Sequence, residues 1–394
     1  MNHVDVAPVP TRSRIAALDA LRGAALFGIL LINIQSFQGP EGGLEAAGEA
    51  AYSAAERTAV TVLTALVQMK FIGAFAFLFG LGLALQGARV DARGGRSGPL
   101  LTRRLLVLAV IGALHAVLIW SGDILFTYAV IGLLALPLRR SPPRALLGAA
   151  AGAYAVALAI LAANVAVTLL LAGDGGAATD ATTSARGAAE AYASGDYGAM
   201  LAQRLDELGR TALSLVVNGP WVFAMIAAGM ATVRAGILDH LEDRRPWLRR
   251  VATVGLGAGL PLNVLAALAL DADPSALSAI GAAAQLLLFA GAPVLTAGYL
   301  AGGALWFLDH PDHALTRALS AVGRMALTNY LLQSVIATAL FYGAGLYGDL
   351  GLLGALALCP LIYAANVGFS LAWLARFPQG PLEALWRRLT YGRG

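Results

Sequence analysis

Residues 59–86, AVTVLTALVQMKFIGAFAFLFGLGLALQ, decide the fold class of this chain. The stretch is mostly apolar and contains a single charged side chain, Lys70. A helix needs about 20 mostly apolar residues to cross the hydrocarbon layer of a bilayer. The stretch therefore predicts a transmembrane helix that is longer than one crossing requires, and that is either tilted or continued by a short interfacial piece.

The composition of the whole chain supports this interpretation. The chain has 394 residues, of which 58% are hydrophobic and 13% are charged, whereas soluble domains carry about a quarter charged residues. Too little polar surface remains to coat a soluble globule, which also excludes a disordered chain and a nucleic-acid binder. A single cysteine, Cys359, excludes a fold held by internal disulfides.

Ten apolar stretches along the chain are long enough to be membrane spans. They predict an all-α, polytopic membrane protein with about ten transmembrane helices in one transmembrane domain covering residues 1–394. The stretches lie at 18–37, 59–86, 104–120, 123–138, 144–171, 211–237, 249–270, 277–308, 318–343 and 350–376.

The charges between these stretches predict the orientation of the helices. Arginines gather in the N-terminal segment, in the even-numbered gaps and in the C-terminal tail, whereas most acidic residues lie in the odd-numbered gaps. Basic loops stay in the cytoplasm, so both termini are expected there, as segments 1–17 and 377–394. Residues 38–58 and 172–210 become external loops, and the second predicts either an interfacial helix or a mobile linker.

Two local patterns predict how helices pack or bend. Gly255 and Gly259, and likewise Gly298 and Gly302, have the four-residue spacing of closely packed membrane helices. Near the outer end of the sixth span, Asn218, Pro220 and Trp221 predict a broken helix, which is tolerated where it is buried in protein or lines a cavity.

Lys70 is the only lysine among 27 basic residues. It lies about eleven residues into its span, ~16 Å from the start of the helix and close to the middle of the membrane. An ammonium group at this depth either pairs with a carboxylate or binds an anionic ligand. The alternative is a snorkelling or structurally paired lysine.

His115 and Asp123 flank the external turn at Ser121–Gly122. A hairpin at this turn brings the imidazole and the carboxylate within reach of each other. A carboxylate orients a histidine and raises its basicity, as a general base or a nucleophile requires. We therefore take His115 and Asp123 as the candidate catalytic pair.

The remaining polar residues of the spans predict binding on two levels. Arginine is the natural partner of phosphate. The basic residues that are candidates for binding a phosphate-bearing co-substrate are Lys70 and four arginines expected at the inner side, Arg22, Arg103, Arg104 and Arg324. The amides of two spans are candidates for binding the other substrate: Asn33, Gln35, Asn329 and Gln333. A cavity is expected to cross the membrane from the arginines past Lys70 to His115. The sequence contains no metal-binding motif and no motif for a covalently bound cofactor.

Five blocks of the sequence resemble one family. They are RIAALDALRGAALFGILLINIQSF (14–37), KFIGAFAFLFGLG (70–82), LHAVLIWSGDIL (114–125), GRMALTNYLLQSVIATALFYGAGL (323–346) and FPQGPLEALWRRLTYG (377–392). With these blocks the chain resembles the YeiB-like family of bacterial inner-membrane proteins, the domain of unknown function 418. The resemblance implies a multi-pass protein of the bacterial inner (cytoplasmic) membrane.

The family is similar, more distantly, to transmembrane acyltransferases that include the lysosomal heparan-glucosaminide N-acetyltransferase. That similarity implies transfer of an acyl group from cytoplasmic acyl-CoA to an acceptor on the far side. The acyltransferase-three group shares the LDxLRG-like start and then carries arginine, ten residues and histidine on its first helix. Here Arg22 is followed by Asn33 at that place, so His115 of the third span takes the role of candidate base.

Three hypotheses for the function follow. The first is an acyltransferase that uses acyl-CoA as co-substrate and a sugar or lipid as acceptor. The second is a transporter or lipid-handling permease for an anionic small molecule, and the third is a structural or sensory membrane protein. The expected partners are membrane lipids, a CoA ester and the acceptor, with no nucleic acid. The oligomeric state stays open, and a homo-oligomer is one alternative.

Overall fold

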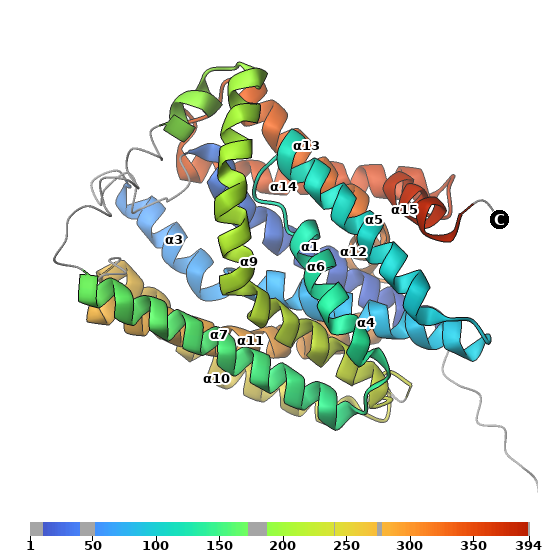
Figure 1. Cartoon of the computed structure of the whole chain (residues 1–394). Coiled ribbons are helices and arrows are strands. Elements are labelled where there is room, and N and C mark those ends of the chain that lie inside the picture. The colour runs from blue at the N-terminus through green and yellow to red at the C-terminus, as the bar shows by residue number, and fades with distance from the viewer. Residues whose placement is uncertain (1–10, 40–51, 172–186, 240, 274–277, 393–394) are drawn as a thin grey trace, which may run out of the picture.

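The computed structural model describes residues 11–39, 52–171, 187–239, 241–273 and 278–392, which form helices joined by short connections (Figure 1). Within these ranges there is no β-strand, and the expected all-α fold is confirmed. The principal elements are α1 (Thr11–Gln38), α3 (Ala54–Leu66), α4 (Lys70–Ala92), α5 (Ser97–Leu118), α6 (Leu125–Ala135), the 3₁₀ helix η2 (Leu136–Arg140), α7 (Pro143–Leu171), α9 (Tyr197–Arg234), α10 (Arg245–Ala272), α11 (Ala279–Asp309), α12 (Ala314–Arg324), α13 (Ala326–Thr338), the π-helix η3 (Ala339–Gly343), α14 (Gly351–Leu374) and α15 (Pro381–Tyr391).

The described residues contain eight helices that are long and apolar enough to cross a membrane. The count becomes nine when α12 and the helix at Ala326–Gly343, which are bent by 86° at their junction, are taken as one span. Nine of the ten expected stretches correspond to these helices. The protein is therefore a multi-pass α-helical membrane protein, and the tenth stretch has a different structure.

The expected span at 123–138 is not one continuous α-helix: it is α-helical at Leu125–Ala135 and continues as the 3₁₀ helix η2. Its helix α6 has 11 residues, which is about 16 Å of rise and much less than the ~30 Å hydrocarbon core. Residues 119–124 lead into α6 as non-helical backbone. Tyr330 accepts a hydrogen bond on its hydroxyl from the Ile124 N–H (3.3 Å), and Asp123 accepts one from the Phe126 N–H (2.7 Å). Such partners are required wherever non-helical backbone lies at membrane depth.

The span at 59–86 is also interrupted, between α3 and α4. Met69 has φ = 66°, a left-handed conformation that ends the run of helical hydrogen bonds. Lys70 follows directly and donates a hydrogen bond from Nζ to the Thr64 carbonyl (2.7 Å) near the end of α3. The extra length of this stretch is therefore taken up by a break near the middle of the span.

The bent pair α12–α13 packs closely against α1. A Cβ atom on Gly323 would lie 1.8 Å from the Asp19 carbonyl oxygen, so no larger residue fits at this crossing. The bend falls at Met325, which is fully buried.

The glycine spacing on the seventh and eighth spans is confirmed as a packing device. A Cβ on Gly255 of α10 would lie 2.5 Å from the Gly298 Cα of α11, and one on Gly259 would lie 2.6 Å from the Leu295 nitrogen. Close backbone approach of this kind is how small residues join helices in lipid. Gly302 makes no such approach.

The sixth span differs from expectation, because α9 runs through Pro220 without a break. Of the two alternatives for residues 172–210, a helix or a linker, the described part is largely helical: residues 187–193 are helical, and α9 begins at Tyr197. With 38 residues, or about 57 Å, α9 is longer than a bilayer is thick. Residues 172–186, and residues 40–51 of the other expected loop, lie outside the described part of the chain.

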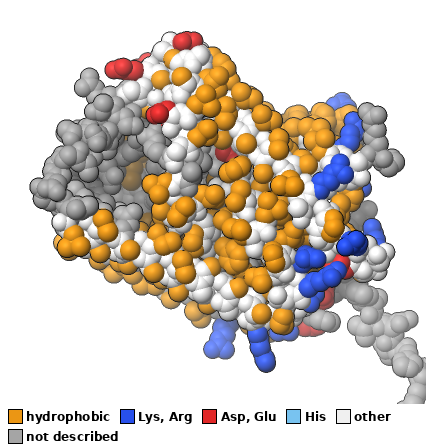
Figure 2. All heavy atoms as spheres, viewed as in Figure 1, with side chains coloured by type: hydrophobic (Ala, Val, Ile, Leu, Met, Phe, Trp, Pro, Cys, Tyr) orange, Lys and Arg blue, Asp and Glu red, His pale blue; other side chains and the backbone are white. Residues whose placement is uncertain are grey.

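The surface charges separate along the long axis of the helices. Figure 2 shows basic side chains gathered at one end of the face in view with some acidic ones among them, only acidic charges at the other end, and a broad apolar belt between the two ends. The α4–α5 and α9–α10 connections and α15 lie at the basic end. This arrangement fits the predicted orientation, with the basic end in the cytoplasm.

Candidate functional site

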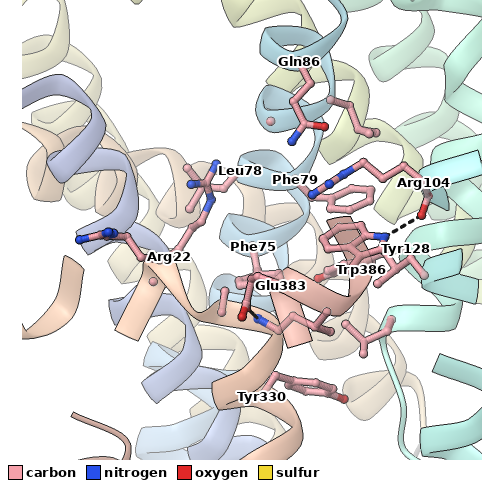
Figure 3. Close-up of a pocket in the computed structure, with 18 residues that line it drawn as sticks. Arg22, Phe75, Leu78, Phe79, Gln86, Arg104, Tyr128, Tyr330, Glu383 and Trp386 are labelled. Carbon is pink, nitrogen blue, oxygen red and sulfur yellow. Dashed lines mark hydrogen bonds between the residues drawn. The ribbon is translucent and has the colours of Figure 1, made fainter. Parts of the chain in front are cut away.

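The basic end contains an arginine-lined cavity of about 210 Å³, which we call the inner cavity (Figure 3). Three of the four predicted inner arginines line it: Arg22, Arg104 and Arg324. They come from three different helices, α1, α5 and α12. The fourth, Arg103, is exposed and is not among the lining residues. Three positive charges around one small cavity are suited to a ligand that carries phosphate.

Each arginine of the inner cavity is held by a different contact. Arg22 forms an ion pair with Asp19 one turn earlier (2.6 Å), and Arg324 donates to the Pro378 carbonyl (3.2 Å). Arg104 lies flat over the indole of Trp386, with its guanidinium carbon 3.5 Å from the ring centre. The Trp386 indole N–H donates to the Arg104 carbonyl (2.8 Å). Among the described residues, no acceptor takes a hydrogen bond from the Arg104 guanidinium.

A carboxylate shares the inner cavity with these arginines. Glu383 of α15 accepts hydrogen bonds from the first N–H groups of α13, on Leu327 (2.8 Å) and Thr328 (3.1 Å), and from the Thr328 hydroxyl (2.6 Å). Burial raises the pKa of Glu383 above its ordinary value, although these hydrogen bonds act in the opposite direction. Glu383 therefore fastens the C-terminal helix to the bend between α12 and α13.

The predicted pair His115 and Asp123 is in contact. The His115 Nδ1 lies 2.7 Å from the Asp123 Oδ2, and both side chains are almost completely buried. A carboxylate accepts and does not donate, so this contact assigns the proton to Nδ1 and leaves Nε2 as an acceptor. The Nε2 atom has no hydrogen-bond partner among the described residues. The ring of Tyr330 lies beside the imidazole, with the ring centres 5.3 Å apart.

A second cavity of about 500 Å³, the outer cavity, lies on the acidic side of this pair. Asp123 and Glu207 contribute carboxylates to its walls, and the remaining polar lining comes from Gln68, Ser121, Thr127 and Asn218. Trp221 also lines it, and its indole N–H is buried without a partner in the described residues. Asn218 and Trp221 thus line a cavity as expected, although α9 is continuous.

The inner and outer cavities are separate, contrary to the expected continuous passage. Tyr128 lies in the walls of both, and its hydroxyl donates to the Ile72 carbonyl of α4 (2.8 Å). Asp123 faces the outer cavity and Tyr330 the inner one, while His115 between them lines neither. We call Tyr128, Tyr330, His115 and Asp123 the septum. The two cavities do not connect because the aromatic side chains of Tyr128 on α6 and Tyr330 on α13 lie between them.

Lys70 is not part of either cavity. Its side chain is fully buried, its Nζ donates to Thr64, and its own carbonyl accepts a hydrogen bond from the Thr296 hydroxyl (3.1 Å). These contacts join α3, α4 and α11 at the break after Met69. These surroundings fit the alternative of a structurally paired lysine rather than a ligand-binding one.

The four amides predicted to bind substrate do not line the two cavities. Asn329 is buried and donates to the Val322 carbonyl (3.0 Å) and the Ser370 hydroxyl (2.8 Å), which joins the bent pair to α14. Gln35 donates to the Leu31 carbonyl of its own helix (3.2 Å). Asn33 is half-buried, and Gln333 is buried with its amide nitrogen unpaired among the described residues. Asn329 and Gln35 therefore hold helices rather than face a ligand.

Sequence reasoning missed the aromatic and acidic residues of the inner cavity and septum. Glu383 and Trp386 lie on the C-terminal helix, beyond the last span, where a single glutamate among arginines gives no signal. Trp386 meets Arg104 across 282 positions of the chain. Tyr128 and Tyr330 are typical of any apolar helix.

Comparison with known proteins identifies relatives over nearly the whole chain. A family model described as "Protein of unknown function (DUF418)" matches residues 232–393. The chain is 34% identical to the uncharacterized protein YxaH of Bacillus subtilis (strain 168), over 98% of this chain and 96% of that protein. It is 34% identical to the uncharacterized protein YeiB of Escherichia coli (strain K12), over 96% of each chain. No solved structure matches.

Proposed function

The chain belongs to the YeiB-like DUF418 family of bacterial proteins, and we propose that it is a membrane-embedded acyltransferase of the inner membrane. In this proposal an acyl-CoA binds from the cytoplasm at the arginines, and a hydroxyl acceptor, on a sugar or a lipid, binds in the outer cavity. The proposal rests on one observation above all: a buried histidine, oriented by a carboxylate and with its Nε2 unpaired in the described residues, lies between the two cavities.

The donor site follows from the inner cavity. At about 210 Å³ the cavity is too small to enclose a complete CoA ester. The pantetheine arm and the thioester would occupy it, while the nucleotide phosphates would meet Arg22 and Arg324 at its rim, because Arg324 is exposed and Arg22 half-buried. Arg104, which lacks an acceptor among the described residues, supplies a guanidinium deeper in the same cavity.

The chemistry balances without a further reactant. The Nε2 atom of His115 takes the proton of the acceptor hydroxyl, and the oxygen forms a bond to the thioester carbonyl carbon. The carbon–sulfur bond then breaks, and the departing thiolate takes the proton from His115 to leave as free CoA thiol. Asp123 keeps Nδ1 protonated and stabilises the imidazolium formed between the two steps.

The septum must open for this reaction, because His115 lines neither cavity. Tyr128 is held by a single hydrogen bond to the Ile72 carbonyl, and α6 begins directly at the septum after a non-helical segment. A half-length helix with an irregular start is the element best suited to shift, since fewer helical hydrogen bonds oppose its movement.

The test is acyl transfer by the purified full-length protein in lipid nanodiscs. His115→Gln and Asp123→Asn are each expected to lower transfer by about 10²- to 10⁴-fold while the affinity for a CoA ester stays within about twofold. His310→Gln is the matched control, because His310 is exposed at the basic end. If calorimetry detects no binding of any CoA ester to the unmodified protein, the proposal is lost.

The two opposed cavities favour a second candidate, a transporter for an anionic small molecule. Two cavities that face opposite sides and meet at one shared side chain, Tyr128, are also what alternating access requires. Concentration-dependent uptake of an organic phosphate into proteoliposomes, lost in Arg104→Gln and retained in His115→Gln, would favour this candidate over the enzyme.

A further inference from the structure

A third cavity, of about 340 Å³, lies beside the inner cavity and is almost entirely apolar. It is bounded by α1, α4, α9, α10 and α11, and none of its lining side chains is charged. Thr232 contributes the single hydroxyl, and that hydroxyl already donates to the Ala228 carbonyl (3.0 Å). We call this space the apolar cavity. Protein interiors are otherwise close-packed, so a space of this size between helices is suited to an apolar ligand.

The apolar cavity and the inner cavity lie back to back on the two sides of α1 and α4. Leu78 of α4 lines both of them. On α1, Leu21 faces the apolar cavity and the next residue, Arg22, lines the inner cavity. Figure 3 shows Leu78 and Arg22 among the side chains that line the inner cavity. A ligand with an anionic part and an apolar part could therefore occupy both cavities by displacing one leucine side chain.

This juxtaposition identifies the class of donor. We infer that the apolar cavity holds the aliphatic chain of the acyl donor, so that the donor is a thioester with a medium-length or long chain rather than acetyl-CoA. The inference rests on the proposed function. A lipid tail alone does not account for the arginines on the other side of Leu78, whereas an acyl-CoA carries its phosphates and its chain in one molecule.

The chain would enter at Leu78 and extend between α9 and α11 toward the basic end. Leu238, Leu241 and Trp247 line the cavity at that end. The carbonyl carbon would remain in the inner cavity, next to the septum. The finite volume of the apolar cavity, about 340 Å³, would limit the length of the chain that it can bury.

The experiment measures binding of CoA and of its acetyl, hexanoyl, octanoyl and decanoyl esters to the protein in nanodiscs. Each affinity is calculated from the concentration of ester that remains free in solution. Affinity is expected to rise by about fourfold for each methylene group buried, until the chain fills the cavity. Ala301→Phe, which places a ring in the apolar cavity, should abolish this rise and leave the affinity for acetyl-CoA unchanged. Ala283→Phe is the control, because Ala283 is exposed on the same helix.

A second variant keeps the test informative if Ala301→Phe fails to fold. Leu241→Ala enlarges the cavity at that end and should move the optimum to a longer ester. Affinities that are independent of chain length, or an Ala301→Phe variant that weakens all esters equally, would overturn the inference and leave the acyltransferase proposal intact. Absence of binding by CoA and every ester would instead overturn the acyltransferase proposal itself.

Discussion

The hydroxyl of Thr328 donates a 2.6 Å hydrogen bond to the carboxylate of Glu383, which lies 55 positions later in the chain. The same carboxylate accepts two backbone N–H groups at the start of α13, on Leu327 and Thr328. A helix N-terminus favours an anion, and here the anion comes from the protein itself. Glu383 thus places a carboxylate beside the arginines of the inner cavity. An incoming phosphate would be attracted by the arginines but repelled by this carboxylate.

Glu383→Gln is expected to strengthen binding of CoA by about three- to tenfold. The substitution removes a negative charge from the inner cavity but keeps an oxygen that can accept from the Leu327 and Thr328 N–H groups, while the amide NH2 can donate to the Thr328 hydroxyl oxygen, so α15 stays in place. Calorimetry with CoA measures the effect. Asp312→Asn, at an exposed residue of the same end, serves as the control. Weaker binding in Glu383→Gln would show that the carboxylate helps the ligand rather than competes with it.

The stability of the protein should depend on pH through the same residue. Burial raises the pKa of Glu383, so the folded protein holds this proton at pH values where the unfolded chain has already lost it. The stabilising contribution is complete below the ordinary pKa of glutamate and is lost as the pH rises through the raised pKa. Thermal unfolding of the wild type and Glu383→Gln should coincide near about pH 4, with Glu383→Gln the more stable at about pH 7. Parallel curves for the two proteins would contradict this.

Gly255→Ala should destabilise the protein by separating α10 from α11. The new Cβ would lie 2.5 Å from the Gly298 Cα, and overpacking of this kind costs about 1–3 kcal/mol. Gly257→Ala on the same helix is the matched control, since nothing lies within 4 Å of its Cβ position. Alanine there should be neutral or stabilising by up to about 1 kcal/mol. Thermal unfolding in one detergent compares the two variants, and equal midpoints would rule out close packing at Gly255.

Lys70→Met should lower stability without changing ligand binding. The substitution leaves the Thr64 carbonyl at the end of α3 without its buried donor, at a cost of about 1–3 kcal/mol. Because Lys70 lines neither the inner nor the outer cavity, the affinity for CoA should be retained. Thermal unfolding and calorimetry on the same preparation separate the two effects. Loss of CoA binding in a stable variant would restore Lys70 as a ligand-binding residue.

The sequence by itself determined the membrane class, the all-α fold and the approximate position of each span, because length and hydropathy are local properties of the chain. It also placed His115 and Asp123 in contact, since only a short turn separates them. Local pattern failed where a span is discontinuous: residues 123–138 are hydrophobic enough for a full helix, but α6 fills only part of them.

Only the tertiary structure decided where the cavities lie and what separates them. Arg104 contacts Trp386, and Glu383 contacts Thr328, because α15 packs against α5 and α13. No periodicity encodes a contact between such distant residues. Tyr128 and Leu78 are ordinary apolar helix residues in the sequence, and each acquires its place in two cavity walls from the helices packed around it. Hydropathy records whether a residue prefers lipid or water, whereas a cavity is the volume that several packed helices leave unfilled.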